Sequence, residues 1–125
     1  MGYRVLIVDD SKLARMSVGK ALDALHPDWV RVEAATAEDA AALLDEVDLV
    51  LLDFNMPGKD GLEFAAELRG LHPDMPVAII SANHQVEIVN RAGAVGAAFL
   101  PKPLTAQALA GFLDDAAERL KAAGL

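Results

Sequence analysis

The amino-acid sequence predicts an α/β protein: a single domain built on a five-stranded parallel sheet with helices on both faces. Apolar, strand-like runs alternate with amphipathic helical patterns along the chain, in five units of about 25 residues each. The third strand-like run, Leu49-Val50-Leu51-Leu52, is wholly aliphatic, which is typical of a strand that is buried on both faces of a parallel sheet. We therefore expect a (βα)5 doubly wound architecture.

Composition narrows the class of protein. The chain has 125 residues, enough for one domain over residues 1–125 with its own core and too few for two. Eleven basic residues against nineteen acidic ones give a net charge of −8, which argues against general nucleic-acid binding. The chain has no cysteine, no visible secretory signal and no apolar stretch of membrane-spanning length, so we expect a cytoplasmic protein without disulfides or membrane contact.

The predicted strands are short apolar runs, each of which ends at a polar or chain-breaking residue. The second strand differs because it alternates, with Val30 and Val32 separated by charged residues. The fourth begins directly after Pro76 and the fifth ends before Pro101. The predicted strands cover residues 3–8, 29–35, 48–53, 77–81 and 97–100.

The predicted helices follow the strands and carry apolar residues near helical spacing. Ser11 is the expected N-cap of the first helix, and Thr36 precedes the second, where Glu38 and Asp39 suit the positive end of the helix dipole. His-Pro-Asp stops the first and third helices, and Gly93 is expected to close the fourth. The predicted helices cover residues 12–25, 37–46, 61–71, 85–92 and 104–122.

The last predicted helix carries an apolar stripe that is wider than one core-facing side needs. Two explanations stay open: the stripe packs entirely in the core, or part of it is a partner or dimer surface. Its members are Leu104, Ala108, Leu109, Phe112, Leu113, Ala116 and Leu120.

In a parallel sheet the carboxyl ends of the strands share one edge, where ligands of doubly wound proteins bind. The first strand brings Asp9 and Asp10 to that edge, the third brings Asp53, the fourth Ser81, and Lys102 follows the fifth. Clustered carboxylates repel one another unless a cation relieves them. Mg²⁺ prefers oxygen ligands, takes one or two carboxylates and leaves room for a phosphate. We therefore expect a Mg²⁺ site beside a phosphate position.

The same groups suit phosphoryl transfer. A carboxylate such as Asp53 is a nucleophile toward phosphorus, and the product is an aspartyl phosphate. The reaction needs positioning and charge neutralisation, which Lys102 and the cation would supply, while Ser81 would donate a hydrogen bond. A purely structural role stays open for each residue: a surface turn for Asp53, helix capping by Asp9 or Asp10, an exposed turn for Lys102 and a backbone-bonded hydroxyl for Ser81.

Four segments carry motifs whose combined order and spacing are specific. They are residues 6–11 (Leu-Ile-Val-Asp-Asp-Ser), 52–57 (Leu-Asp-Phe-Asn-Met-Pro) with Asp60-Gly61, 80–82 (Ile-Ser-Ala) and 99–103 (Phe-Leu-Pro-Lys-Pro). Together they resemble the response-regulator receiver domain of two-component signalling. The resemblance covers nearly the whole chain and implies a flavodoxin/CheY-like fold and a signalling switch rather than an enzyme.

The resemblance also implies a metal site. Asp53 is similar to the phosphoacceptor, and Asp10 is similar to the acid that binds Mg²⁺ directly, with Asp9 acting mainly through water. Asp53 itself and the backbone carbonyl of Asn55 would complete the protein ligands.

Three further residues match positions that the family uses. Ser81 matches the hydroxyl that bonds the phosphoryl group, and Lys102 matches the lysine before the last helix, with a cis peptide bond to Pro103. Phe99 matches the aromatic switch residue that moves inward on activation; it lacks the hydroxyl of a tyrosine, so a switch there would rest on packing. Lys59 stands where the family usually has a methionine. This difference lies in a loop beside the site and puts no catalytic role in doubt.

The resulting hypothesis is a stand-alone phospho-acceptor switch. A histidine kinase or phosphotransfer protein would donate a phosphoryl group to Asp53 in a Mg²⁺-dependent reaction. Output would be docking of a downstream protein to the fourth helix, fifth strand and fifth helix, with the chain a monomer or weak homodimer. The sequence does not identify the kinase, the target, the phosphoryl lifetime, the oligomeric state or whether the chain was cut from a longer regulator.

Three alternatives compete with this hypothesis. A phosphatase of the haloacid dehalogenase type also uses an aspartate nucleophile and Mg²⁺, but its second acid would stand at the position of Asn55. A flavodoxin-like binding module would need a phosphate-cradling loop where Asp9 and Asp10 stand. A degenerate receiver that is never phosphorylated is disfavoured because all five site groups are present.

Overall fold

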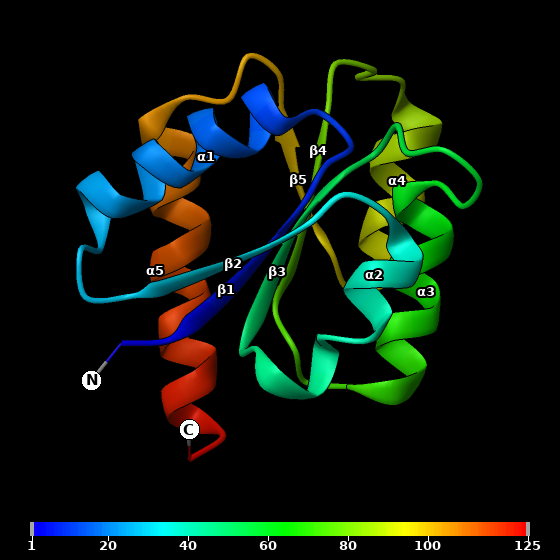
Figure 1. The fold of residues 1–125 in the computed structure, drawn as a ribbon. Helices are drawn as coiled ribbons and strands as arrows, with labels where there is room; N and C mark the ends of the chain where they lie inside the picture. The colour runs from blue at the N-terminus through cyan, green and yellow to red at the C-terminus, as the bar shows by residue number, and fades with distance from the viewer. Residues whose placement is uncertain (1, 125) are drawn as a thin grey trace.

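The structure is a computed structural model that describes residues 2–124. Five parallel strands form one sheet in the order β2-β1-β3-β4-β5, and helices cover both of its faces (Figure 1). The strands are β1 (Arg4–Val8), β2 (Val30–Ala34), β3 (Leu49–Asp53), β4 (Val77–Ser81) and β5 (Ala98–Pro101). The helices are α1 (Lys12–Leu25), α2 (Ala37–Ala41), α3 (Gly61–Leu71), α4 (Val86–Ala94) and α5 (Ala106–Ala122), with a short 3₁₀ turn η1 (Leu44–Glu46). The predicted doubly wound fold is confirmed.

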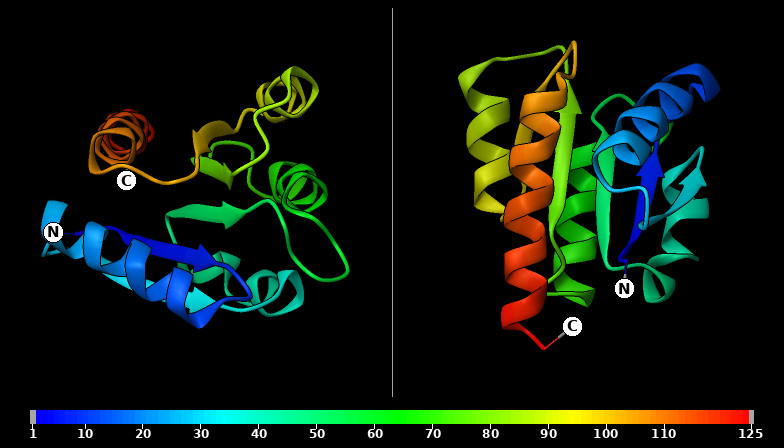
Figure 2. Two further views of the ribbon diagram at one scale, coloured as in Figure 1. Left: turned by 90° about the horizontal axis from the view of Figure 1, so that it is seen from above. Right: turned by 90° about the vertical axis from the view of Figure 1, so that its left-hand side faces the viewer.

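The central strand β3 separates two hydrophobic layers. Leu49 and Leu51 pack toward α1 and α5, whereas Val50 and Leu52 pack toward α2, α3 and α4. The views in Figure 2 show the same division of helices between the two faces. All four side chains are fully buried, as the unbroken aliphatic run predicts. Asp53 therefore stands at the end of a strand whose four preceding side chains are packed in the core.

The apolar stripe on the last helix belongs to the core. Its five central members are buried against the sheet, and Leu104 and Ala108 are half-buried against the same cluster. Core packing therefore accounts for the stripe. The helix begins slightly later than predicted, because the Thr105 side chain accepts a hydrogen bond from the Ala108 N–H at 3.1 Å and caps it. No helix within residues 2–124 is long and apolar enough to span a bilayer.

The second helix is shorter than predicted. α2 ends at Ala41, and the chain continues through η1 instead of remaining α-helical to Glu46. In a 3₁₀ turn, side chains three residues apart stand one above the other. Leu44 and Val47 have this spacing and are both buried, so the tighter turn lets both enter the core just before β3. Periodicity alone does not reveal this change of pitch.

The sequence predicts that Gly93 closes the fourth helix, but in the structure the closing residue is Gly96. α4 runs to Ala94, and Gly96 follows with a φ of 70°. The Ala97 N–H donates to the Ala92 carbonyl at 2.9 Å and the Gly96 N–H donates to the Gly93 carbonyl at 3.0 Å. This is a Schellman motif, whose left-handed residue is normally glycine because it has no Cβ.

The two glycines make a matched pair for a stability test. Gly96→Ala is expected to lower the free energy of unfolding by about 1 kcal/mol, because alanine is strained at a positive φ. Gly93→Ala is expected to raise it by about 0.5–1 kcal/mol, because Gly93 is helical and a Cβ there meets no heavy atom within 4 Å. Urea denaturation of both variants measures the difference; shifts of the same sign would contradict the assigned helix end.

Candidate functional site

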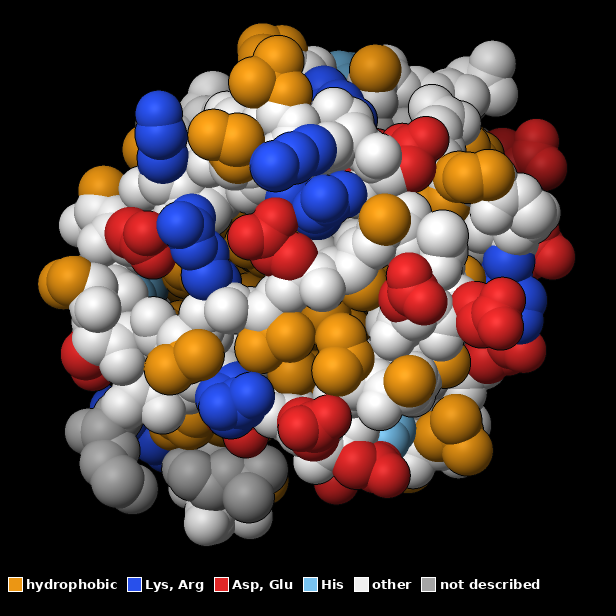
Figure 3. Space-filling model, in the orientation of Figure 1, with side chains coloured by type: hydrophobic (Ala, Val, Ile, Leu, Met, Phe, Trp, Pro, Cys, Tyr) orange, Lys and Arg blue, Asp and Glu red, His pale blue; other side chains and the backbone are white. Residues whose placement is uncertain are grey.

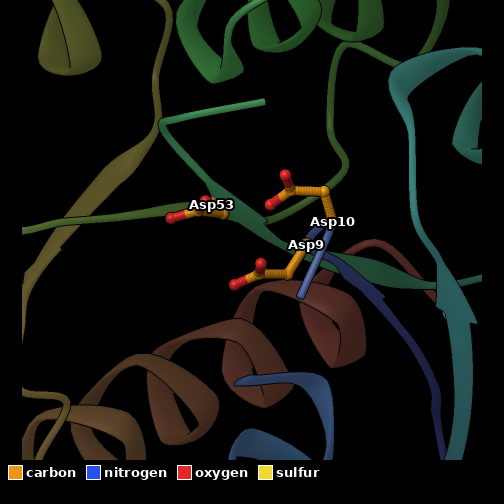
Figure 4. A group of neighbouring side chains, drawn as sticks. All are labelled: Asp9, Asp10 and Asp53. Atoms are coloured by element: carbon orange, nitrogen blue, oxygen red, sulfur yellow. The ribbon is translucent and has the colours of Figure 1, made fainter. Parts of the chain in front are cut away.

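Three carboxylates meet at the carboxyl-terminal edge of the sheet. β1 and β3 are paired with Val8 opposite Leu52, so Asp9 and Asp53 emerge side by side. One carboxylate oxygen from each of Asp9, Asp10 and Asp53 lies within 4.8 Å of the others. Figure 4 shows the three side chains converging on one space beyond the ends of β1 and β3. The predicted clustering of these acids is therefore present in the structure.

The environment of the three acids differs. Asp9 and Asp53 are 7% and 5% exposed, whereas Asp10 is exposed to solvent. Asp9 Oδ1 accepts a hydrogen bond from the Ser11 N–H at 2.9 Å. Asp53 Oδ1 accepts one from Lys102 Nζ at 2.8 Å, which is also an ion pair. Each of the two buried carboxylates thus accepts one hydrogen bond, and both lie close to the exposed carboxylate of Asp10.

Burial raises the pKa of Asp9 above its ordinary value, and the negative charges of Asp53 and Asp10 add to this effect. The Ser11 N–H and the charge of Lys102 oppose the rise without cancelling it. A hard divalent cation among the three carboxylates would relieve the repulsion between their negative charges. The all-oxygen donor set matches the preference of Mg²⁺. The residues present therefore fit the predicted metal.

This pKa has a consequence for stability. Folded Asp9 holds its proton more tightly than the unfolded chain does, so its ionisation lowers the free energy of unfolding. The free energy of unfolding begins to fall as the pH rises above the ordinary pKa of the carboxyl group in the unfolded chain. It stops falling above the raised pKa of folded Asp9. In chelator at pH 7, Asp9→Asn is expected to melt at a higher temperature than wild type, with the difference shrinking as the pH is lowered or Mg²⁺ is added. Thermal unfolding across pH tests this; a less stable variant at pH 7 would contradict it.

Lys102 and Ser81 reach the site from the neighbouring strands. Ser81 ends β4 opposite Pro101 of β5, and the Lys102 N–H donates to the Ser81 carbonyl at 2.9 Å. The peptide bond between Lys102 and Pro103 is cis, as predicted. The Ser81 side chain is buried, and its Oγ accepts a hydrogen bond from the Asn83 N–H at 3.0 Å. The serine hydroxyl therefore also organises the loop between β4 and α4.

Phe99 and Asn55 lie at the margins of the site. Phe99, on β5, is half-buried and makes an edge-to-face contact with His84, with ring centroids 5.9 Å apart. His84 belongs to the same β4–α4 loop as Asn83. Asn55 follows Asp53 by two residues in the loop to α3, and its side chain is exposed. The roles predicted for Phe99 in switching and for the Asn55 carbonyl in metal binding stay predictions.

Two residues to which the sequence analysis assigned no individual role support the site. Arg15, on α1, donates from Nη1 to the Asp9 carbonyl at 2.6 Å and from Nε to Glu33 at 3.0 Å, so it braces the acidic loop against β2. Gly61 opens α3, where a Cβ would lie 2.7 Å from the Asp53 carbonyl oxygen. Only glycine allows this approach. The sequence marks Gly61 as part of a motif, but nothing in it distinguishes Arg15 from a surface arginine.

The fold and the site together define a class: a doubly wound α/β domain whose sheet edge brings together three carboxylates and a lysine, a set of groups compatible with a divalent cation. The family model of the response regulator receiver domain matches residues 5–114. The chain belongs to this family, and the resemblance inferred from its motifs is confirmed. Receiver domains are typically phospho-acceptor switches and not enzymes.

Individual relatives agree with this assignment. The chain is 38% identical over 100 residues to the glycerol metabolism activator of Pseudomonas putida, covering 75% of this chain and 45% of that protein. It is 33% identical over 110 residues to the response regulator protein FleR of Pseudomonas aeruginosa, covering 87% of this chain and 23% of that protein. The chain thus spans less than half the length of these two relatives.

Solved structures show the same fold. A CheY-like response regulator receiver domain protein from Methanospirillum hungatei superposes with a TM-score of 0.86 at 25% identity. The match covers 97% of this chain and 98% of that one. The flavodoxin/CheY-like fold that the family resemblance implies is therefore confirmed over nearly the whole length.

Proposed function

We propose that this chain is a phospho-acceptor switch that takes a phosphoryl group on Asp53 from a histidine kinase or a phosphotransfer protein. One observation carries the proposal. The Asp53 carboxylate is nearly buried at the end of a rigid strand, with Lys102 Nζ at 2.8 Å and two further carboxylates within 4.8 Å. An acid in that setting is fixed in position and has a cation-binding space beside it, as an attacking carboxylate requires.

The residues divide the work of phosphoryl transfer between them. An Asp53 oxygen attacks phosphorus and forms the acyl phosphate bond, while the bond to the donor breaks and its electron pair leaves with the donor group. Lys102 lies beside the attacking oxygen and balances the negative charge of the incoming group. Bound Mg²⁺, held by Asp10, Asp53 and the Asn55 carbonyl with Asp9 acting through water, would neutralise phosphoryl oxygens.

The switch would follow because the Ser81 hydroxyl can bond both the β4–α4 loop and the phosphoryl group. Its hydroxyl is bonded to the Asn83 N–H in this structure, and donation to a phosphoryl oxygen would draw the β4–α4 loop toward Asp53. His84 moves with that loop and touches Phe99, so the loop shift would change how Phe99 packs on β5. The surface of α4, β5 and α5 would then present a different shape to a downstream partner. We place this reaction in the cytoplasm and expect a monomer or weak homodimer.

Intact-protein mass spectrometry tests the proposal. Incubation with acetyl phosphate and Mg²⁺ is expected to add the mass of one phosphoryl group, and chelation of the metal is expected to prevent the addition. Beryllofluoride, which mimics a phosphoryl group, should shift amide NMR signals in the β4–α4 loop and on β5. An unmodified protein under all these conditions would refute the switch. Sustained hydrolysis of unrelated phosphate esters would instead support a phosphatase.

A further inference from the structure

A groove made of two adjoining parts lies beside α3, next to the short α2. Its first part has a volume of about 500 Å³ and lies between α2 and α3. Its second part, of about 390 Å³, leads on toward the loop before β4. Leu44 and Leu71 line both parts, so the two parts adjoin each other. We call this feature the α2–α3 groove. Its apolar lining includes Ala37, Leu44, Phe64, Leu68, Leu71 and Met75, and of these six only Leu71 is largely exposed.

Leu71 is a large apolar side chain in the groove that no other part of the described chain covers. The other large apolar side chains of α3, including Phe64 and Leu68, are buried, whereas Leu71 is 71% exposed at the end of the helix. It lines both parts of the groove. A large apolar side chain in this position contributes little to folding and is well placed to anchor a bound segment.

The walls of the groove are acidic. Glu38, Asp45, Asp48, Glu67 and Asp74 line it. Figure 3 shows acidic side chains gathered on the α2–α3 side of this face, while most of the lysine and arginine side chains lie on the opposite side.

The groove has little positive charge of its own. Among the described residues that line it, Lys59 is the only lysine or arginine, and it is paired with Glu67. An apolar floor between acidic walls is complementary to a ligand that is apolar on one side and cationic on the other.

We propose that the α2–α3 groove binds an amphipathic, basic helix of a partner protein. Apolar side chains at helical spacing would enter the groove beside Leu44 and Leu71, and lysine or arginine side chains would meet Glu38 and Asp45. α3 has 11 residues, and at a rise of 1.5 Å per residue its length of about 16 Å matches three turns of a docked helix. The first part of this surface lies between α2 and α3, and Leu120 of α5 lines the second part.

The groove also borders the loop that follows the phosphoacceptor. Pro57, Gly58 and Lys59 line its upper end, four to six residues after Asp53. Asp53 does not line the groove, so the binding inferred here goes beyond the switch function and does not depend on it. A second copy of this chain is a poorer occupant, because two chains of net charge −8 repel each other.

An NMR titration of the isotopically labelled protein tests the proposal. The probe is a synthetic helical peptide of about 14 residues with leucines at i, i+3 and i+7 and lysines elsewhere, and its control keeps the leucines but carries glutamates. The lysine peptide is expected to shift amide signals of α2, η1 and α3, and to bind at least tenfold more tightly than the glutamate peptide. Equal binding of the two peptides, or shifts that map mainly to α1, would overturn the proposal.

Two matched variants sharpen the test. Leu71→Glu is expected to weaken binding of the lysine peptide at least tenfold, whereas Leu13→Glu, at a 76% exposed leucine on α1, should leave it unchanged. Asp53→Asn should bind the peptide as wild type does, which separates this outcome from any failure of phosphorylation. If Leu71→Glu binds normally, the groove is not the site. If sedimentation shows self-association that Leu71→Glu abolishes, the occupant is a second copy and the partner-helix proposal is wrong.

Discussion

Asp53→Asn is expected to take up no phosphoryl group from acetyl phosphate under conditions in which the wild-type protein is modified. The asparagine amide has nearly the shape of the carboxylate but carries no charge and is a poor nucleophile. Loss of a nucleophile lowers the rate of a covalent step by roughly a thousandfold or more. Intact-protein mass after a fixed incubation measures the effect, and beryllofluoride should leave the amide spectrum of the variant unchanged.

The folded state of Asp53→Asn should remain intact. The substitution removes the ion pair with Lys102, but it also removes one of three like charges that crowd the sheet edge. Because these effects oppose each other, the thermal midpoint should change far less than the phosphorylation rate. If the variant is modified as fast as wild type, Asp53 is not the phosphoacceptor and the exposed Asp10 becomes the next candidate. If it fails to fold, the more conservative comparison is Asp53→Glu, which keeps the charge and misplaces it.

Much of the site could be predicted because, in a parallel sheet, the residues that end the strands all lie along one edge. Once each strand is recognised, its carboxyl-terminal residue must lie at one edge of the sheet. Asp9, Asp53 and Ser81 were placed together on this ground alone, and the register of β1, β3 and β4 confirms that they emerge as neighbours. Lys102 follows the fifth strand and is expected at the same edge, and its hydrogen bond to Asp53 confirms that position.

Other features depend on three-dimensional contacts that leave no pattern in the sequence. Gly93 and Gly96 are equally plausible helix ends, and only the backbone conformation distinguishes them. The brace from Arg15 to the Asp9 carbonyl joins a helix to a loop through a backbone atom, which has no sequence signature. The α2–α3 groove exists because the helix after Thr36 stops early, and helical periodicity predicted that it would continue.

Lys102→Ala is expected to slow phosphorylation of Asp53 by about a hundredfold to a thousandfold, the usual effect of removing a group that stabilises charge in the transition state. In this structure Lys102 Nζ lies 2.8 Å from Oδ1 of Asp53, the proposed nucleophile, so its positive charge lies close to where negative charge would accumulate. Lys102→Arg should recover only part of the rate, because a planar guanidinium cannot take the position of a compact ammonium. Initial rates of mass gain with acetyl phosphate and saturating Mg²⁺ measure both variants.

Metal affinity separates a chemical role of Lys102 from a merely structural one. The lysine and a divalent cation both neutralise Asp53, so they compete electrostatically for the same carboxylate. Lys102→Ala should therefore bind Mg²⁺ at least as tightly as wild type while phosphorylating more slowly, and a titration followed by amide NMR signals measures that affinity. A parallel loss of metal binding and phosphorylation would mean that the substitution has disturbed the sheet edge itself. Tighter metal binding with slower transfer would place Lys102 in the reaction.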